Sequence, residues 1–114
     1  MEFLLLIYED EGRLAKLKEQ EFGSELGEYR ALGKEYAGAI KGGNALQPTR
    51  SARTVRVRDG KSLVTDGPFA ETKEQLGGYY LVDARDAEEA ASIGAKIPAA
   101  RYGSIEVRPI MKFS

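Results

Sequence analysis

The chain has 114 residues, with 17 lysines and arginines against 18 aspartates and glutamates, so its net charge at pH 7 is -1. This near balance offers no strong electrostatic field to nucleic acid or to an anionic membrane surface. The absence of cysteine and histidine excludes disulfides, thiolate chemistry and the commonest metal ligand and general base. The length predicts one domain over residues 1–114 with one small core.

The early apolar run at residues 3–8 is too short for the core of a signal peptide, and it follows Glu2 rather than a basic flank. No later run approaches the length that a membrane span requires. We therefore expect a cytoplasmic protein without a membrane partner, and we do not expect it to bind nucleic acid.

Residues 3–8, FLLLIY, are continuously apolar, which is typical of a strand that is buried on both faces. A small domain with two helices can cover only one face of its sheet. The second face needs another cover, and the simplest one is a second copy of the chain. The run therefore predicts a homodimer.

Apolar residues recur at spacings of three and four from Leu14 to Ile40, which predicts an amphipathic helix. Glycines within this stretch each cost about 1 kcal/mol relative to alanine, so packing must hold the helix, and a break near residues 22–24 is plausible. Gly42-Gly43-Asn44 would end the helix, and Ala45–Pro48 would form a short extended piece.

Two strand-like runs, residues 54–58 and 61–65, flank Asp59-Gly60. Asp-Gly between such runs is a strong signal for a two-residue hairpin. In that register Val55 faces Val64, so the valines share one side of the hairpin and the basic residues share the other.

The strand predicted at Leu76–Val82 contains Gly77-Gly78, which suggests a bulge or a second backbone that approaches closely. Asp86, with Glu89 three residues later, matches the capping pattern at the start of a helix. This helix has a face of small residues suited to close packing on the sheet, and Pro98 ends it.

Residues 105–111 alternate between apolar and polar side chains and predict the last strand. Pro109 lacks an N–H group, so this strand belongs at a sheet edge. Apart from the inserted hairpin, the order of elements is βαββαβ, which is the ferredoxin-like arrangement. The predicted class is α+β, with an antiparallel sheet and two helices on one face.

Asp66-Gly67-Pro68-Phe69 combines turn-forming residues at the exit of the hairpin. The Asp66 carboxylate could act there as a general base or anchor a ligand, because functional residues gather on loops. The same carboxylate could instead accept hydrogen bonds from its own turn.

Glu71, Lys73 and Glu74 could line a pocket with Asp66, although a solvated loop explains the same charges. Arg101 could bind an anionic group or stack on Tyr102. The remaining tyrosines are interpreted as aromatics of the core or the dimer face: Tyr8, Tyr29, Tyr36, Tyr79 and Tyr80. The candidate ligand-binding residues are Asp66, Gly67, Pro68, Phe69, Glu71, Lys73 and Arg101. No metal-ligand cluster or phosphate-binding loop is present, so we expect no metal and no cofactor.

The segment DGPFAETKEQLGGYYLVDARD at residues 66–86 resembles the DGPF-motif branch of the YCII-related family. The segments FLLLIYEDE, GGNALQP, TVRVRDG and IPAARYGSIEVRPIM also resemble it, so the resemblance covers nearly the whole chain. It implies a ferredoxin-like fold that dimerises as an α/β barrel, without an established reaction. Other branches carry a histidine and an aspartate proposed as a catalytic pair, and this chain has no histidine.

Three functions are open at this point. The first is a homodimeric module that binds a small polar or anionic molecule; members of the branch resemble domains found beside extracytoplasmic-function sigma factors, which would suit a regulatory role. The second is a cofactor-independent isomerase, lyase or oxygenase, with Asp66 as base and Arg101 or a tyrosine steadying an enolate-like oxygen. The third is a pure dimerisation module.

Overall fold

The computed structural model describes residues 1–113. Its strands are β1 (Glu2–Glu9), β2 (Ile40–Ala45), β3 (Arg53–Arg58), β4 (Lys61–Asp66), β5 (Gln75–Asp83) and β6 (Ser104–Pro109). Its helices are α1 (Glu11–Lys16), α2 (Glu19–Glu35) and α3 (Ala87–Gly94), with short 3-10 turns at Thr49–Ser51 and Pro98–Arg101. Across these residues, no helix combines the length and apolar character needed to cross a membrane.

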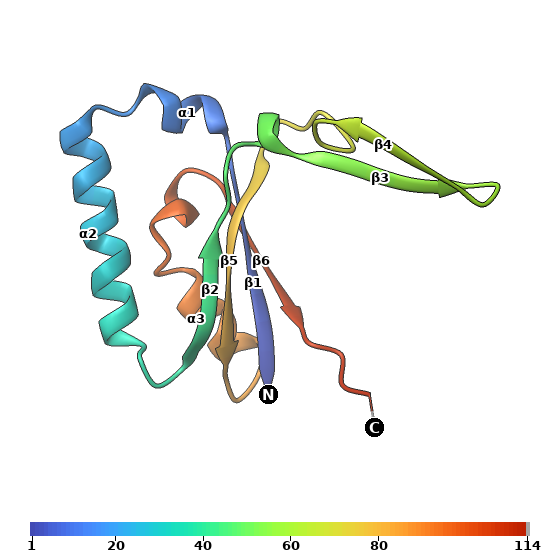
Figure 1. Cartoon of the computed structure of the whole chain (residues 1–114). Helices are drawn as coiled ribbons and strands as arrows, with labels where there is room; N and C mark the ends of the chain where they lie inside the picture. Colours follow the sequence, from blue (N-terminus) through green and yellow to red (C-terminus); the bar gives the residue numbers. More distant parts are fainter. Residues whose placement is uncertain (114) are drawn as a thin grey trace.

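Four strands form one antiparallel sheet in the order β2-β5-β1-β6, and β3 pairs with β4 in a separate hairpin. Without the hairpin this is the ferredoxin-like order, which confirms the predicted α+β class. β6 lies at a sheet edge, as Pro109 predicted. The helices all lie on one side of the sheet (Figure 1).

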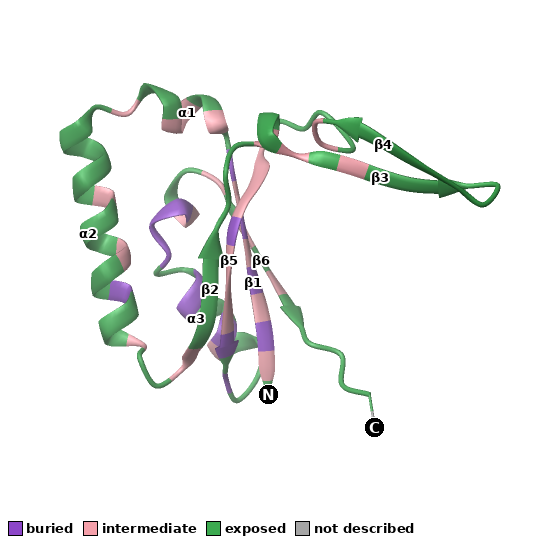
Figure 2. Ribbon diagram, in the orientation of Figure 1, coloured by how far each residue is buried: buried purple, intermediate pink, exposed green. Residues whose placement is uncertain are grey.

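β1 alternates strictly between the two faces of the sheet. Phe3, Leu5 and Ile7 are buried on the helix side, whereas Leu4 and Leu6 on the other side are only half-buried. Within one chain every helix packs on the same face (Figure 2), as expected for two covering helices, and burial of the second face by another copy stays a prediction. The second face is left open.

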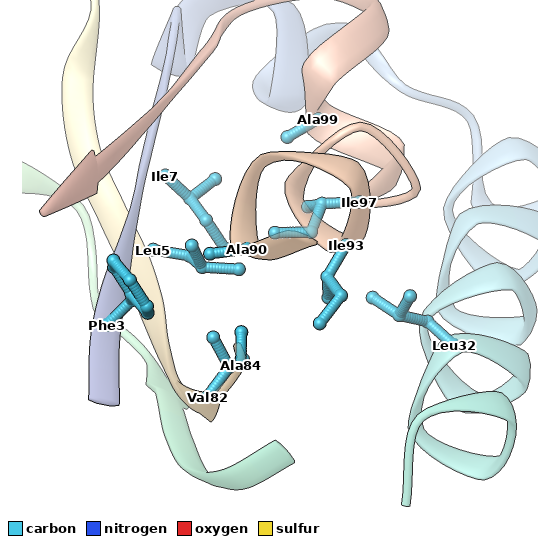
Figure 3. Packing of buried hydrophobic residues seen from close by; sticks show 10 residues of the cluster. All are labelled: Phe3, Leu5, Ile7, Leu32, Val82, Ala84, Ala90, Ile93, Ile97 and Ala99. Carbon is cyan, nitrogen blue, oxygen red and sulfur yellow. The ribbon is translucent and has the colours of Figure 1, made fainter. Parts of the chain in front are cut away.

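The core lies between the sheet, α3 and the C-terminal half of α2. Its buried apolar residues are Phe3, Leu5, Ile7, Leu32, Val82, Ala84, Ala90, Ile93, Ile97 and Ala99. Leu32 of α2 points toward Ile93 of α3 (Figure 3). Gly94 lets α3 approach β6 closely, since a Cβ there would lie 3.3 Å from the Ile105 side chain. Burying a large apolar side chain of this kind contributes about 1.5–3 kcal/mol.

The long helix differs from its prediction at both ends. The break lies at Leu17-Lys18, between α1 and α2, rather than at residues 22–24. α2 ends at Glu35, so Ile40 begins the edge strand β2, and Gly42-Gly43-Asn44 lies inside that strand instead of capping a helix.

The physical reason for this difference is close contact between β2 and β5. A Cβ on Gly43 would lie 2.6 Å from the Tyr79 carbonyl oxygen, so glycine serves the strand pairing. The predicted extended piece at Ala45–Pro48 overlaps β2 only at Ala45, so the strand begins earlier than predicted. The chain stays extended beyond it, since the Leu46 N–H donates to the Gly77 carbonyl oxygen at 2.8 Å.

In the second half of the chain the bulge and the helix cap are confirmed, whereas α3 ends at Gly94, before the predicted stop at Pro98, which begins a 3-10 turn. The register shifts so that Ile7 pairs with Gly78 and Tyr8 with Leu76, which leaves Gly77 as the extra residue of a bulge. At α3, the Asp86 carboxylate accepts a hydrogen bond of 2.9 Å from the backbone N–H of Glu89, as a capping residue does.

Residues 53–66, called the arm below, project from the sheet on the side opposite the helices (Figure 1). The predicted hairpin register is confirmed, since Val55 pairs with Val64. Val55, Val57 and Val64 are 63%, 59% and 57% exposed. The radius of gyration is 16.1 Å, against about 13 Å for a compact chain of this length. An isolated two-stranded hairpin is at best marginally stable, and most residues of the arm are exposed within one chain.

Two glycines offer a matched test of the fold. A Cβ at Gly103 would lie 2.1 Å from the Tyr8 carbonyl oxygen, whereas a Cβ at Gly33 on α2 meets open space. We expect Gly103→Ala to lower the free energy of unfolding by at least about 2 kcal/mol and Gly33→Ala to raise it by about 1 kcal/mol. Urea unfolding followed by far-UV circular dichroism measures both, and equal effects of the two variants would contradict the packing described at Gly103.

Candidate functional site

A cavity of about 470 Å³ lies between α1, α2 and the helix-facing side of the sheet. Its volume is within the range of small-molecule sites in proteins. Its lining residues are mainly apolar, aromatic or glycine: Ile7, Glu9, Leu14, Phe22, Glu25, Leu26, Tyr29, Gly43, Asn44, Ala45, Leu46, Gly77, Gly78, Tyr79 and Tyr80.

Small residues in the sheet make room for the cavity. Gly43, Ala45 and Gly78 lie in neighbouring register positions of β2 and β5, beneath the N-terminal half of α2. The C-terminal half of α2 is anchored to the core through Leu32. Further toward the N-terminus, Phe22 is exposed although it lines the cavity, so this half of the helix covers an open space rather than a filled core.

One end of the cavity is polar. Glu9 is 8% exposed and continues the buried parity of β1. Arg13 Nη2 donates to Glu9 Oε2 at 3.0 Å and to Glu25 Oε1 at 2.9 Å. The guanidinium also lies over the ring of Tyr102, 4.0 Å from its centroid. Three elements therefore meet at this group: β1, α1 and α2.

Two phenols of the cavity are held in their neutral form. Burial, followed by the negative charge of Glu9, raises the pKa of Tyr29 far above its usual value. Burial also raises the pKa of Tyr80. Both tyrosines pack against the core, as predicted for these aromatics. At neutral pH they therefore offer hydroxyl groups and aromatic faces, and no phenolate base.

The DGPF segment lies outside this cavity. The Asp66 side chain is 93% exposed, and its carboxylate lies 3.6 Å from Nε of Arg53 across the hairpin. Gly67 has a positive φ of 94°, which glycine tolerates best, and its N–H donates to the Ala52 carbonyl oxygen at 2.7 Å. Pro68 is half-buried; Phe69, Glu71 and Lys73 are exposed.

Arg101 lies elsewhere, next to the N-terminal half of α2. Its guanidinium donates two hydrogen bonds to the Glu28 carboxylate, at 2.6 and 2.9 Å. These contacts raise the pKa of Arg101 above its usual value. Arg101 also lies 5.4 Å from the centroid of the Tyr102 ring, which agrees with the stacking alternative. Within one chain, Arg101 and the DGPF segment do not meet in a common pocket.

Glu9, Arg13 and Glu25 are not among the residues predicted from the sequence. The alternation Phe3, Leu5, Ile7 nevertheless predicts that Glu9, the next residue of that parity, faces the helices. Only tertiary structure brings the other two residues to it. No group of three or more carboxylates within residues 1–113 could hold a metal ion.

The raised pKa of Tyr29 predicts a dependence of stability on alkaline pH. Its contribution is complete below about pH 10, where an exposed phenol in the unfolded chain is neutral. It is lost as pH rises further, because only the unfolded chain then releases the proton. Between pH 10 and 11.5, the free energy of unfolding of the unmodified protein should fall by up to about 1.4 kcal/mol per pH unit more than that of Tyr29→Phe. Urea titrations measure the slopes, with the exposed Tyr102→Phe as control. Identical slopes for Tyr29→Phe and the unmodified protein would refute the assignment.

Comparison with known proteins extends over the whole chain. A family model described as the YCII-related domain matches residues 1–114. The chain is also similar to a protein of Rhizobium meliloti (strain 1021) that carries the name Uncharacterized protein R00369. The two are 38% identical over 114 residues, which cover 96% of this chain and 92% of the relative. The chain therefore belongs to the YCII-related domain family.

Proposed function

We propose that this protein is a homodimeric module of the DGPF-motif branch that binds a small molecule in the cavity beneath α2. The observation that carries the proposal is a cavity of about 470 Å³ with a buried carboxylate at one end. Such a cavity combines an apolar lining with a few polar groups that could orient a ligand. The Asp66–Phe69 motif supports assignment to the branch.

The same observation favours binding over a role in dimerisation alone. A module that only assembles has no use for a cavity in which Glu9 and Glu25 converge. Pairing with Arg13 offsets the cost of burying these two carboxylates, so the unfilled space beside them is what favours binding. A regulatory role would follow if occupancy of the cavity changed how the protein meets a partner.

Two surfaces support a second copy as the cover of the open face. On that face, Leu4 pairs with Leu81 and Leu6 pairs with Tyr79, and all four side chains are half-exposed. The arm, with its exposed valines, projects from the same side of the sheet (Figure 2). Contiguous apolar surface of this kind is typical of protein interfaces.

The enzyme alternative has less support in a single chain. Asp66 is solvated beside Arg53, and Arg101 is engaged by Glu28. The DGPF segment lies at the base of the arm, so its predicted role in ligand binding would depend on a second copy bringing other groups to it. We keep that role as a prediction and prefer the cavity as the binding site.

Filling the cavity tests the proposal. Ala45 lines the cavity, whereas Ala31 is exposed on α2 and does not. Thermal-shift screening of a broad library of small metabolites, each at micromolar to millimolar concentration, should find compounds that raise the melting temperature, because a ligand that binds only the folded state stabilises it. We expect Ala45→Phe to abolish these shifts and Ala31→Phe to retain them. A flat response of the unmodified protein across the library, or shifts that survive in Ala45→Phe, would count against the cavity as the site.

A further inference from the structure

The polar end of the cavity carries excess negative charge. Glu9 and Glu25 share the single guanidinium of Arg13 through contacts of 3.0 and 2.9 Å, so the three groups together carry a net charge of -1. Both carboxylates line the cavity. The lining contains no lysine and no arginine, so nothing within the cavity wall itself balances the remaining charge.

Arg13 is absent from the lining of this space. It lines the neighbouring groove beside Tyr102 rather than the cavity, and its guanidinium lies over the Tyr102 ring. Each carboxylate gives Arg13 one oxygen: Oε2 of Glu9 and Oε1 of Glu25. The other oxygen of each retains its capacity to accept hydrogen bonds. A ligand in the cavity would therefore meet the free oxygen of each carboxylate, while Arg13 binds the other oxygen.

The rest of the wall suits the body of such a ligand. Phe22, Tyr29 and Tyr80 supply aromatic rings, and Leu14 and Leu26 supply aliphatic surface. Aromatic faces attract cations, and a charge in a poorly solvated site interacts more strongly than it does in water. The negative charge, the hydrogen-bond acceptors and the aromatic rings all favour a cationic hydrogen-bond donor, such as an ammonium group.

Resting on the function proposed above, we infer that the ligand is a small primary amine with an aromatic or branched aliphatic body. Its ammonium group binds Glu9 and Glu25, and its apolar body lies beneath α2 against the glycines of β2 and β5. A carboxylate ligand would meet net repulsion at the same place. This class differs from the anionic ligand that Arg101 suggested in the sequence.

Three compounds that share a phenyl ring and a short linker test the class: 2-phenylethylamine, 2-phenylethanol and 3-phenylpropanoate. Isothermal titration calorimetry on the full chain should give the amine a Kd at least ten-fold lower than that of the alcohol, with the acid weakest. Glu9→Gln should bring the amine to the level of the alcohol. Glu35→Gln makes the same substitution at an exposed residue of α2 that lies outside the cavity, so it should keep the preference.

Circular dichroism checks that each variant is folded. If Glu9→Gln does not fold, Glu25→Gln provides a second variant. Equal or tighter binding of the alcohol or the acid in the unmodified protein would overturn the amine class and leave the cavity as a binding site. An amine preference that survives in both glutamine variants would also overturn the role of these two carboxylates and leave the cavity as a binding site. Absence of binding by all three compounds, together with a flat library screen, would overturn the proposed function as well.

Discussion

All three helices of this protein cover the same face of a four-stranded sheet, and the other features of the molecule depend on that constraint. The covered face contains the buried side chains of β1, including Phe3 and Leu5. The uncovered face presents Leu4, Leu6 and their partners on β5 half-exposed to water. Apolar area left in water forgoes about 25 cal/mol per Å², so a cover for this face would add considerable stability.

The covered face is also incompletely filled, and this produces the cavity. α2 is anchored by Leu32 near its C-terminal end, while glycines in β2 and β5 leave space beneath its N-terminal half. Glu9 extends the buried register of β1 into that space, so a carboxylate stands where the alternation would otherwise place an apolar side chain. The sheet thereby links the two proposals: one face would serve assembly and the other would serve binding.

The sequence predicted the features that depend on residues close together in the chain, such as turns, caps and bulges. The Asp59-Gly60 turn set the hairpin register, Gly77-Gly78 predicted the bulge, Asp86 predicted the helix cap and Pro109 predicted an edge strand. Gly42-Gly43 was misread because glycine suits both a helix end and a strand that approaches its neighbour closely, and only the contact with Tyr79 decides between them.

The site could not be predicted in the same way. Glu9, Arg13 and Glu25 come from β1, α1 and α2, and their contacts depend on where α2 turns back over the sheet. The parity of Glu9 on β1 was the one signal available in the sequence. The DGPF segment, which the sequence predicted as a candidate ligand-binding site, lies near the arm and away from the cavity. Its residues stay candidates for a site that two copies would build.

The central claim is that a second copy covers the open face of the sheet. Sedimentation equilibrium across nanomolar to micromolar concentrations tests it most directly. We expect twice the mass of one chain for the unmodified protein, and a shift to the mass of one folded chain when Leu6→Lys places a charge at the centre of the open face. A folded single chain at every concentration, with the open face in contact with water, would contradict it.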